Sequence, residues 1–153
     1  MEQPIKAFEI KDGKSNYVKL EIIEVYGFPD QTSFRGGYDI KCNLTIKSGL
    51  YLADTNYYLS STGALYNFYN DLNKVYKELN GAAKYEVYLS ENDLTFTVLF
   101  EQGEVKVTGR YQDNPTEKNI LEFEFYSDQS FFYEVLQDLK TVINLFGDNK
   151  GKN

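Results

Sequence analysis

The sequence predicts an α+β fold, in which a mainly antiparallel sheet is covered on one face by two amphipathic helices. Apolar residues recur at three- and four-residue steps in segments 61–81 and 129–146, as in a helix with one buried face. Elsewhere apolar and polar residues alternate in short runs that are separated by turns, as in strands with one solvated face. These two patterns together favour helices packed on a sheet.

The strands of the first half precede the first helix. Phe8 and Ile10 indicate a short strand before the turn around Gly13. Alternation then predicts strands at 17–26, 38–47 and 50–59. Residues 27–37 form the longest irregular connection, where functional residues often lie. An equally good interpretation is a surface loop that tucks Phe28 and Phe34 onto the core.

The first helix has recognisable ends. Ser61 or Thr62 can accept hydrogen bonds from the free N–H groups of the first turn. Gly81 is expected to supply the left-handed residue that commonly ends a helix. The buried stripe between these ends contains Leu65, Phe68, Leu72, Val75, Tyr76 and Leu79.

The second half repeats the order of strands followed by a helix. Alternation predicts strands at 84–89, 94–100, 104–111 and 119–126, joined as an antiparallel meander. The second helix is expected to begin after the cap Asp128 and to end at Gly147. The chain length suits one domain, residues 1–147, and the polar residues 148–153 are expected to be a disordered tail.

The two helices resemble each other. Residues 70–76 (NDLNKVY) and 137–143 (QDLKTVI) align at an offset of 67 residues. A duplicated unit of strands and helix would explain this, but two unrelated helices on one sheet face would show similar stripes. The sequence leaves both explanations open.

The composition argues against most enzymes. The chain has no histidine and a single cysteine, Cys42, which lies at an inward position of its strand. Catalysis by a serine or cysteine paired with histidine, most zinc sites and an internal disulfide are therefore excluded. We expect a protein without a cofactor, without a metal and without catalytic activity. The N-terminus lacks the features of a signal peptide and no run suits a membrane span, so we expect a cytoplasmic protein with no membrane partner.

The charge indicates what kind of partner the chain can attract. Sixteen basic and 23 acidic residues give a net charge of −7. Such a chain repels nucleic acid and attracts a basic protein surface over long distances. Direct nucleic-acid binding is therefore not expected.

Several short motifs occur in order along the chain. They are Tyr26-Gly27-Phe28-Pro29, Gly37-Tyr38-Asp39-Ile40, Ser61-Thr62-Gly63-Ala64-Leu65-Tyr66-Asn67-Phe68, Asn119-Ile120-Leu121-Glu122-Phe123-Glu124 and Asp128-Gln129-Ser130-Phe131. Together they resemble the WapI family of bacterial immunity proteins over most of the chain. This resemblance implies a cytoplasmic antitoxin that binds the C-terminal domain of a cognate polymorphic, contact-dependent toxin encoded beside it. Toxins of this group include tRNA-cleaving nucleases, whose basic surfaces would attract an acidic inhibitor.

We expect the open face of the sheet to contact the toxin. On it, Asp39, Glu122 and Glu124 would make electrostatic contacts and Tyr57 or Tyr58 would be an aromatic anchor. A face that is merely solvated is the alternative. We expect a monomer or weak dimer.

Two other functions remain open at this point. The main one is a small-ligand-binding module with a cavity between sheet and helices, lined by Tyr38, Tyr76 and Tyr133. An enzyme is the more distant one, because it would need a deep cleft that gathers carboxylates.

Overall fold

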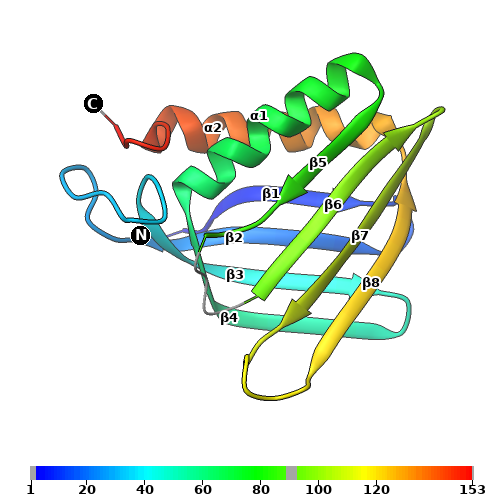
Figure 1. Cartoon of the computed structure of the whole chain (residues 1–153), viewed down its shortest axis with the longest axis horizontal. Coiled ribbons are helices and arrows are strands. Elements are labelled where there is room, and N and C mark those ends of the chain that lie inside the picture. The colour runs from blue at the N-terminus through cyan, green and yellow to red at the C-terminus, as the bar shows by residue number, and fades with distance from the viewer. Residues whose placement is uncertain (1–2, 89–92, 153) are drawn as a thin grey trace.

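A computed structural model of the chain describes residues 3–88 and 93–152 (Figure 1). In this part of the chain, two runs of strands each end in an α-helix. The first run consists of β1 (Ile5–Lys11), β2 (Tyr17–Val25), β3 (Asp39–Ser48), β4 (Tyr51–Ser61) and α1 (Thr62–Glu78). The second consists of β5 (Gly81–Tyr85), β6 (Asp93–Glu101), β7 (Glu104–Gln112), β8 (Ile120–Ser127), the short 3₁₀ helix Gln129–Phe131 and α2 (Phe132–Phe146).

The predicted α+β class is confirmed, and the strands divide into two sheets rather than one. Their orders are β1-β2-β3-β4 and β5-β6-β7-β8, and every pairing is antiparallel between neighbours in the sequence. The division follows from the position of α1, which separates β4 from β5. Most predicted strands are found within a few residues of their expected bounds. The strand expected at 84–89 begins earlier, at Gly81, and residue 89 lies outside the described residues.

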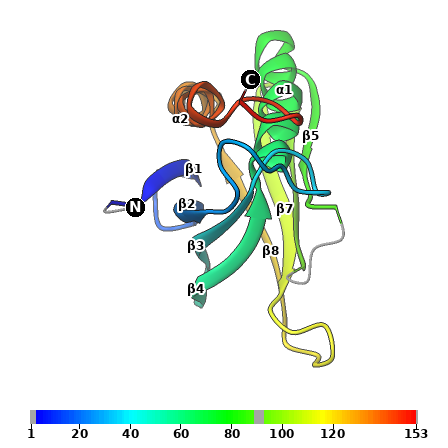
Figure 2. The same cartoon turned by 90° about the vertical axis from the view of Figure 1, so that its left-hand side faces the viewer.

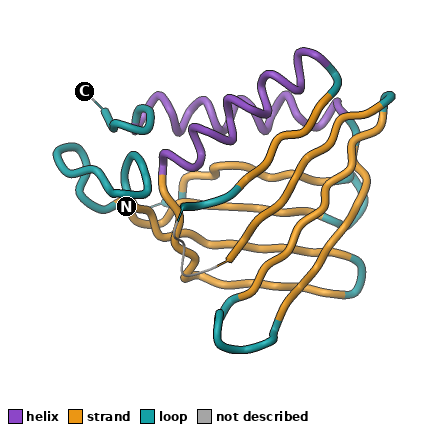
Figure 3. The backbone as a smooth tube through the Cα atoms, in the orientation of Figure 1, coloured by secondary structure: helices purple, strands orange, loops and turns teal. Residues whose placement is uncertain are grey.

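The helices close one side of the molecule. α1 packs beside β5, α2 packs beside β1, and the two helices contact each other. Figures 2 and 3 show both helices on the same side of the two sheets. The helices therefore cover the β1 and β5 edges, whereas β4 and β8 have no further strand paired to their outer edges in the described part of the chain.

An aromatic cluster fills the space between the sheets and the helices. Phe8 of β1, Phe68 of α1, Tyr85 of β5 and Phe96 of β6 are buried. The ring centroids of Phe8 and Phe68 lie 5.8 Å apart, and those of Tyr85 and Phe96 lie 5.1 Å apart and stacked. This interior is solid rather than hollow at the place where a ligand cavity was an alternative.

The helix ends agree only in part with the sequence prediction. The Ser61 hydroxyl accepts a hydrogen bond from the Ala64 N–H at 3.1 Å, and Gly147 ends α2, as predicted. The left-handed residue after α1 is Leu79, with φ of 56°, and not Gly81, which already belongs to β5. The chain therefore leaves the helix two residues earlier than expected, and Gly81, with φ of 115°, is the first residue of β5.

Residues 148–152, which the sequence predicts to be disordered, are hydrogen-bonded to the 27–37 loop in the structure. The Gly37 N–H donates to the Asn149 carbonyl at 2.7 Å. The Tyr38 hydroxyl accepts from the Lys152 N–H at 2.8 Å and donates to the Pro29 carbonyl at 2.8 Å. Tyr38 is thus a structural link between loop and tail.

The two halves have corresponding architectures. Each consists of four strands followed by a helix, and each helix packs beside the first strand of the other half. The uncovered strands β4 and β8 are the last strands of their halves. The repeated order predicted from the sequence is confirmed, while a common origin of the halves stays a hypothesis.

Candidate functional site

Asp39 is already engaged by its own neighbours. It is the first residue of β3, beside the loop that precedes that strand. The Ser33 hydroxyl donates to its carboxylate at 2.6 Å, and the Arg35 guanidinium lies 3.4 Å from it. Its negative charge is therefore partly compensated within the chain, which weakens its electrostatic attraction for a basic partner.

Glu122 and Glu124 lie together on the outer face of β8. Lys106 is 3.7 Å from Glu124, and Arg110 is the cross-strand neighbour of Glu122. This face is mixed in charge rather than acidic. Asp39 belongs to the other sheet, so the structure does not gather the three predicted carboxylates on one sheet face.

The two predicted tyrosine anchors differ in their exposure to solvent. Tyr57 is 60% exposed, whereas Tyr58 is fully buried. A bulge explains the difference, because Cys42 pairs with Tyr58 and Leu44 pairs with Thr55, which gives β4 one extra residue there. The extra residue turns Tyr58 inward and leaves Tyr57 outside. The structure therefore corrects Tyr58 to a core residue that no partner can reach in this conformation.

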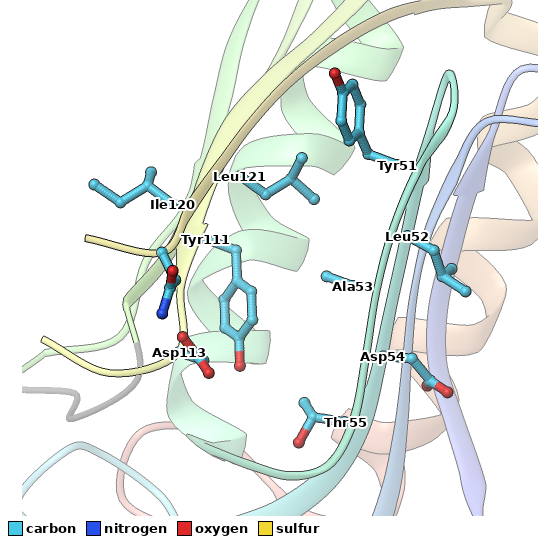
Figure 4. A pocket seen from close by; sticks show the side chains of 10 residues that line it. Tyr51, Leu52, Ala53, Asp54, Thr55, Tyr111, Asp113, Ile120 and Leu121 are labelled. Atoms are coloured by element: carbon cyan, nitrogen blue, oxygen red, sulfur yellow. The ribbon is translucent and has the colours of Figure 1, made fainter. Parts of the chain in front are cut away.

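A groove lies between the uncovered strands β4 and β8 (Figure 4). Its volume is about 490 Å³. We call it the edge groove, and its lining consists of residues 51–55 of β4, Tyr111, Asp113, and residues 119–121 at the start of β8. Figure 4 shows the side chains of Tyr51, Ala53 and Thr55 on the side of β4 that faces Tyr111 and Leu121. Those of Leu52 and Asp54 are on the opposite side of the strand.

The groove combines apolar surface with acidic residues. Its two charged lining residues, Asp113 and Asp54, are both acidic, although the Asp54 carboxylate points to the other side of β4 and accepts a hydrogen bond from the Thr45 hydroxyl at 3.2 Å. Neither forms an ion pair within residues 3–88 and 93–152. Burial, and secondarily the charge of Asp113, raises the pKa of Tyr111, so this phenol stays neutral. Such a surface suits an apolar segment that carries a basic residue.

The described residues offer little for catalysis. In that part of the chain no group of three or more histidine, cysteine, aspartate or glutamate residues could hold a metal ion. Cys42 is buried, and its burial raises the pKa of the thiol, which keeps it protonated. Tyr38 is fully buried while Tyr133 is 62% exposed, so they do not face one common cavity.

Comparison with known proteins identifies the family. The model of the Immunity protein WapI-like family matches residues 9–147, which is nearly the whole chain. This chain belongs to that family. The resemblance seen in the short sequence motifs is thereby confirmed. Searches of the curated proteins and of the solved structures found no match to the chain.

Membership of the WapI-like family supports an immunity role and a toxin as the partner. None of the described helices is both long and apolar enough for a membrane span. The edge groove is the feature of the candidate site that the sequence did not predict. Its signal was the run Leu50-Tyr51-Leu52, in which consecutive apolar residues break the alternation of a strand with one solvated face.

Proposed function

We propose that this chain is a non-catalytic immunity protein that binds and neutralises the C-terminal toxin domain of a cognate polymorphic toxin. The family match over residues 9–147 is the observation that carries this proposal. The solid aromatic interior supports protein recognition over ligand storage, since the space between sheets and helices is occupied by side chains. The cognate toxin domain is encoded beside this chain.

The toxin domain is a nuclease of the tRNA-cleaving kind. Its substrate is a polyanion, so its substrate-binding surface must present basic side chains. The net charge of −7 supports this partner, because opposite charges accelerate the encounter of two proteins. The immunity protein acts in the cytoplasm, where tRNA is found, as a monomer or weak dimer.

The contact surface combines the edge groove with its neighbours along the same strands. Tyr57 is two residues beyond the groove residue Thr55 on β4, and Glu122 is two residues beyond Ile120 on β8. Glu124 extends this surface along β8, whereas Asp39, which pairs with Ser61, lies at the other end of the β3–β4 ladder and outside this surface. Tyr57 is the aromatic anchor because it is exposed and large.

Protection of cells tests the proposal. The toxin domain encoded beside this chain is expressed from an inducible promoter, alone or together with the immunity protein, and growth and tRNA integrity are measured. We expect the toxin alone to arrest growth and cleave tRNA, and co-expression to restore both. An Ile22→Asp variant, which places a charge in the core, should fail to protect. Full toxicity in the presence of abundant, folded wild-type protein would overturn the proposal.

A further inference from the structure

The edge groove runs along the backbone edge of β4. Successive side chains of a strand point to opposite faces, so a hollow on one face meets only every second residue. The edge groove instead meets five consecutive residues, 51–55. The side chains of Leu52 and Asp54 point away from it, so the groove reaches the backbone of β4, which is the edge strand of its sheet.

The hairpin geometry identifies which backbone groups point outward. β3 and β4 are joined by the two-residue loop Gly49–Leu50, and Ser48 pairs with Tyr51 beside it. In such a hairpin the flanking pair exchanges both backbone hydrogen bonds, and the pattern then alternates along the ladder. The N–H and C=O groups of Leu52 and Asp54 consequently face away from β3. They are free donors and acceptors for an added strand.

The apolar side chains at this edge are unusually exposed. Leu50, Tyr51 and Leu52 expose 97%, 68% and 60% of their surface. An edge strand normally avoids such exposure, because an apolar unpaired edge is prone to pair with another chain. Across the groove, Tyr111 and Leu121 provide a second apolar wall.

We propose that an extended segment of the cognate toxin domain pairs with β4 along residues 51–55 and becomes a fifth strand of the β1–β4 sheet. This inference rests on the proposed function and adds the strand pairing through which the toxin domain binds. Alternate apolar side chains of the toxin segment fill the groove between Ala53 and Leu121. Backbone hydrogen bonds to Leu52 and Asp54 fix its register.

The charges of the groove favour the toxin over a second copy of this chain. Asp113 lines the groove, and Asp54 lies on the other side of β4, where it accepts a hydrogen bond from the Thr45 hydroxyl at 3.2 Å. Each attracts a basic side chain on its own side of the incoming segment, and a nuclease is rich in such side chains. A second copy would bring the same carboxylates and a further net charge of −7 to the contact. Like charges at a closely packed edge oppose association.

The bulge in β4 sets the far end of the pairing. The Tyr57 N–H donates to the Thr55 hydroxyl at 3.1 Å, so this backbone group is already satisfied. The free edge therefore extends over residues 51–55, about 16 Å at 3.3 Å per residue. That length equals a strand of common size. Tyr57 then lies where the toxin segment leaves the edge.

Proline substitutions test the pairing. Leu52→Pro removes an outward N–H without breaking the β3–β4 ladder, since proline is tolerated where the N–H of an edge strand faces solvent. We expect its Kd for the toxin domain to rise about tenfold or more relative to Leu52→Ala, which keeps the N–H. Tyr126→Pro, compared with Tyr126→Ala, is the matched control on the β8 edge. The Glu101–Glu104 hairpin pair fixes the alternation of β7, so the N–H of Tyr126, which pairs with Lys106, points outward from β8.

The outcomes separate the possible failures. Equal affinity of Leu52→Pro and Leu52→Ala, or a loss confined to Tyr126→Pro, would overturn pairing at β4 while leaving the immunity function intact. Absence of binding by the wild-type protein would instead reject the proposed function itself. A wild-type dimer that Leu52→Pro converts to a monomer, in gel filtration without toxin, would assign the edge to a second copy.

Hydrogen exchange provides a test that does not depend on folding of a variant. Exchange of the backbone amides is measured in the wild-type protein, free and in complex with the toxin domain. We expect the amides of Leu52 and Asp54 to become protected in the complex, and the outward amide of Tyr126 on β8 to change little. Unchanged exchange at both β4 amides in a saturated complex would contradict the proposal.

Discussion

Two buried tyrosine hydroxyls are hydrogen-bonded to each other at the meeting point of the two sheets. The hydroxyls of Tyr58 and Tyr85 lie 3.0 Å apart, and the Ser60 hydroxyl lies 2.7 Å from that of Tyr85. All three residues are buried, and Tyr58 and Ser60 belong to one sheet while Tyr85 belongs to the other. This polar group therefore links the two halves inside an otherwise apolar core.

Removal of the Tyr85 hydroxyl should destabilise the fold. Tyr85→Phe leaves the hydroxyls of Tyr58 and Ser60 without this partner, and we expect a loss of about 1–3 kcal/mol in the free energy of unfolding. Urea denaturation measures it. Tyr133→Phe is the matched control, since Tyr133 is exposed and should change stability by less than about 0.5 kcal/mol. Equal stability of the two variants would contradict the role assigned to this hydroxyl.

Alkaline pH should destabilise the protein through its buried acids. Burial raises the pKa of Cys42, Tyr58 and Tyr85 in the folded state above the ordinary values of 9.0 and 10.0. The free energy of unfolding is therefore highest at pH values below the pKa values that these groups have in the unfolded chain, and it falls as the pH rises through and beyond those pKa values. Denaturation measured between pH 7 and 11 should show this fall in the free energy of unfolding. In Cys42→Ala, the part of the fall that begins near pH 9 should be absent. A flat profile to pH 11 would contradict the burial of these groups.

Residue-level prediction succeeded where alternation holds and failed where it breaks. Cys42 points inward as its strand pattern predicts. Tyr57 and Tyr58 could not be distinguished, because the bulge that reverses their orientations depends on pairing with β3 and leaves no mark in the strand's own pattern. The alternation places Lys106 and Glu124 on the same kind of open face but does not predict that they form an ion pair. Lys106 becomes the neighbour of Glu124 only through strand pairing.

At the scale of elements, the end of α1 retains conformational strain. Leu79 adopts φ of 56°, a left-handed conformation that costs a residue with a side chain about 1–2 kcal/mol. Its side chain is 49% exposed, so burial offsets little of that cost. The sequence suggested Gly81 for this position because glycine is the usual residue there.

Glycine at position 79 should therefore stabilise the protein. For Leu79→Gly we expect a gain of about 0.5–1 kcal/mol in the free energy of unfolding, after allowance for the greater freedom of glycine in the unfolded chain. Leu79→Ala is the control, because alanine loses the side chain but keeps the Cβ atom that makes this conformation unfavourable. A gain for alanine as large as that for glycine would assign the effect to the side chain instead.

Charge on β8 should influence how fast the toxin is captured. Reversal of Glu122 and Glu124 to lysine should slow association with the toxin domain and reduce its salt dependence. Reversal of Glu78 and Glu134, which lie on the helices, changes the net charge by the same amount. Stopped-flow measurements on both double variants separate a local contact from a general effect of charge. Equal slowing by both pairs would remove β8 from the contact surface.

For the whole molecule, the sequence predicts the elements well and their assembly poorly. The α+β class, both helical stripes and the order of strands follow from local periodicity. The separation into two sheets does not, because all pairings are between neighbouring strands and either arrangement would give the same pattern. The edge groove depends on how β4 and β8 approach each other across the two halves. No local pattern contains that information.

The central claim is that this chain neutralises a toxin by direct binding. Isothermal titration calorimetry with the toxin domain encoded beside it, at a low and a high salt concentration, tests this claim most directly. We expect a tight one-to-one complex whose affinity falls at the higher salt concentration, because an acidic protein meets a basic one. Absence of binding at both salt concentrations, with the toxin domain folded and active, would contradict the claim.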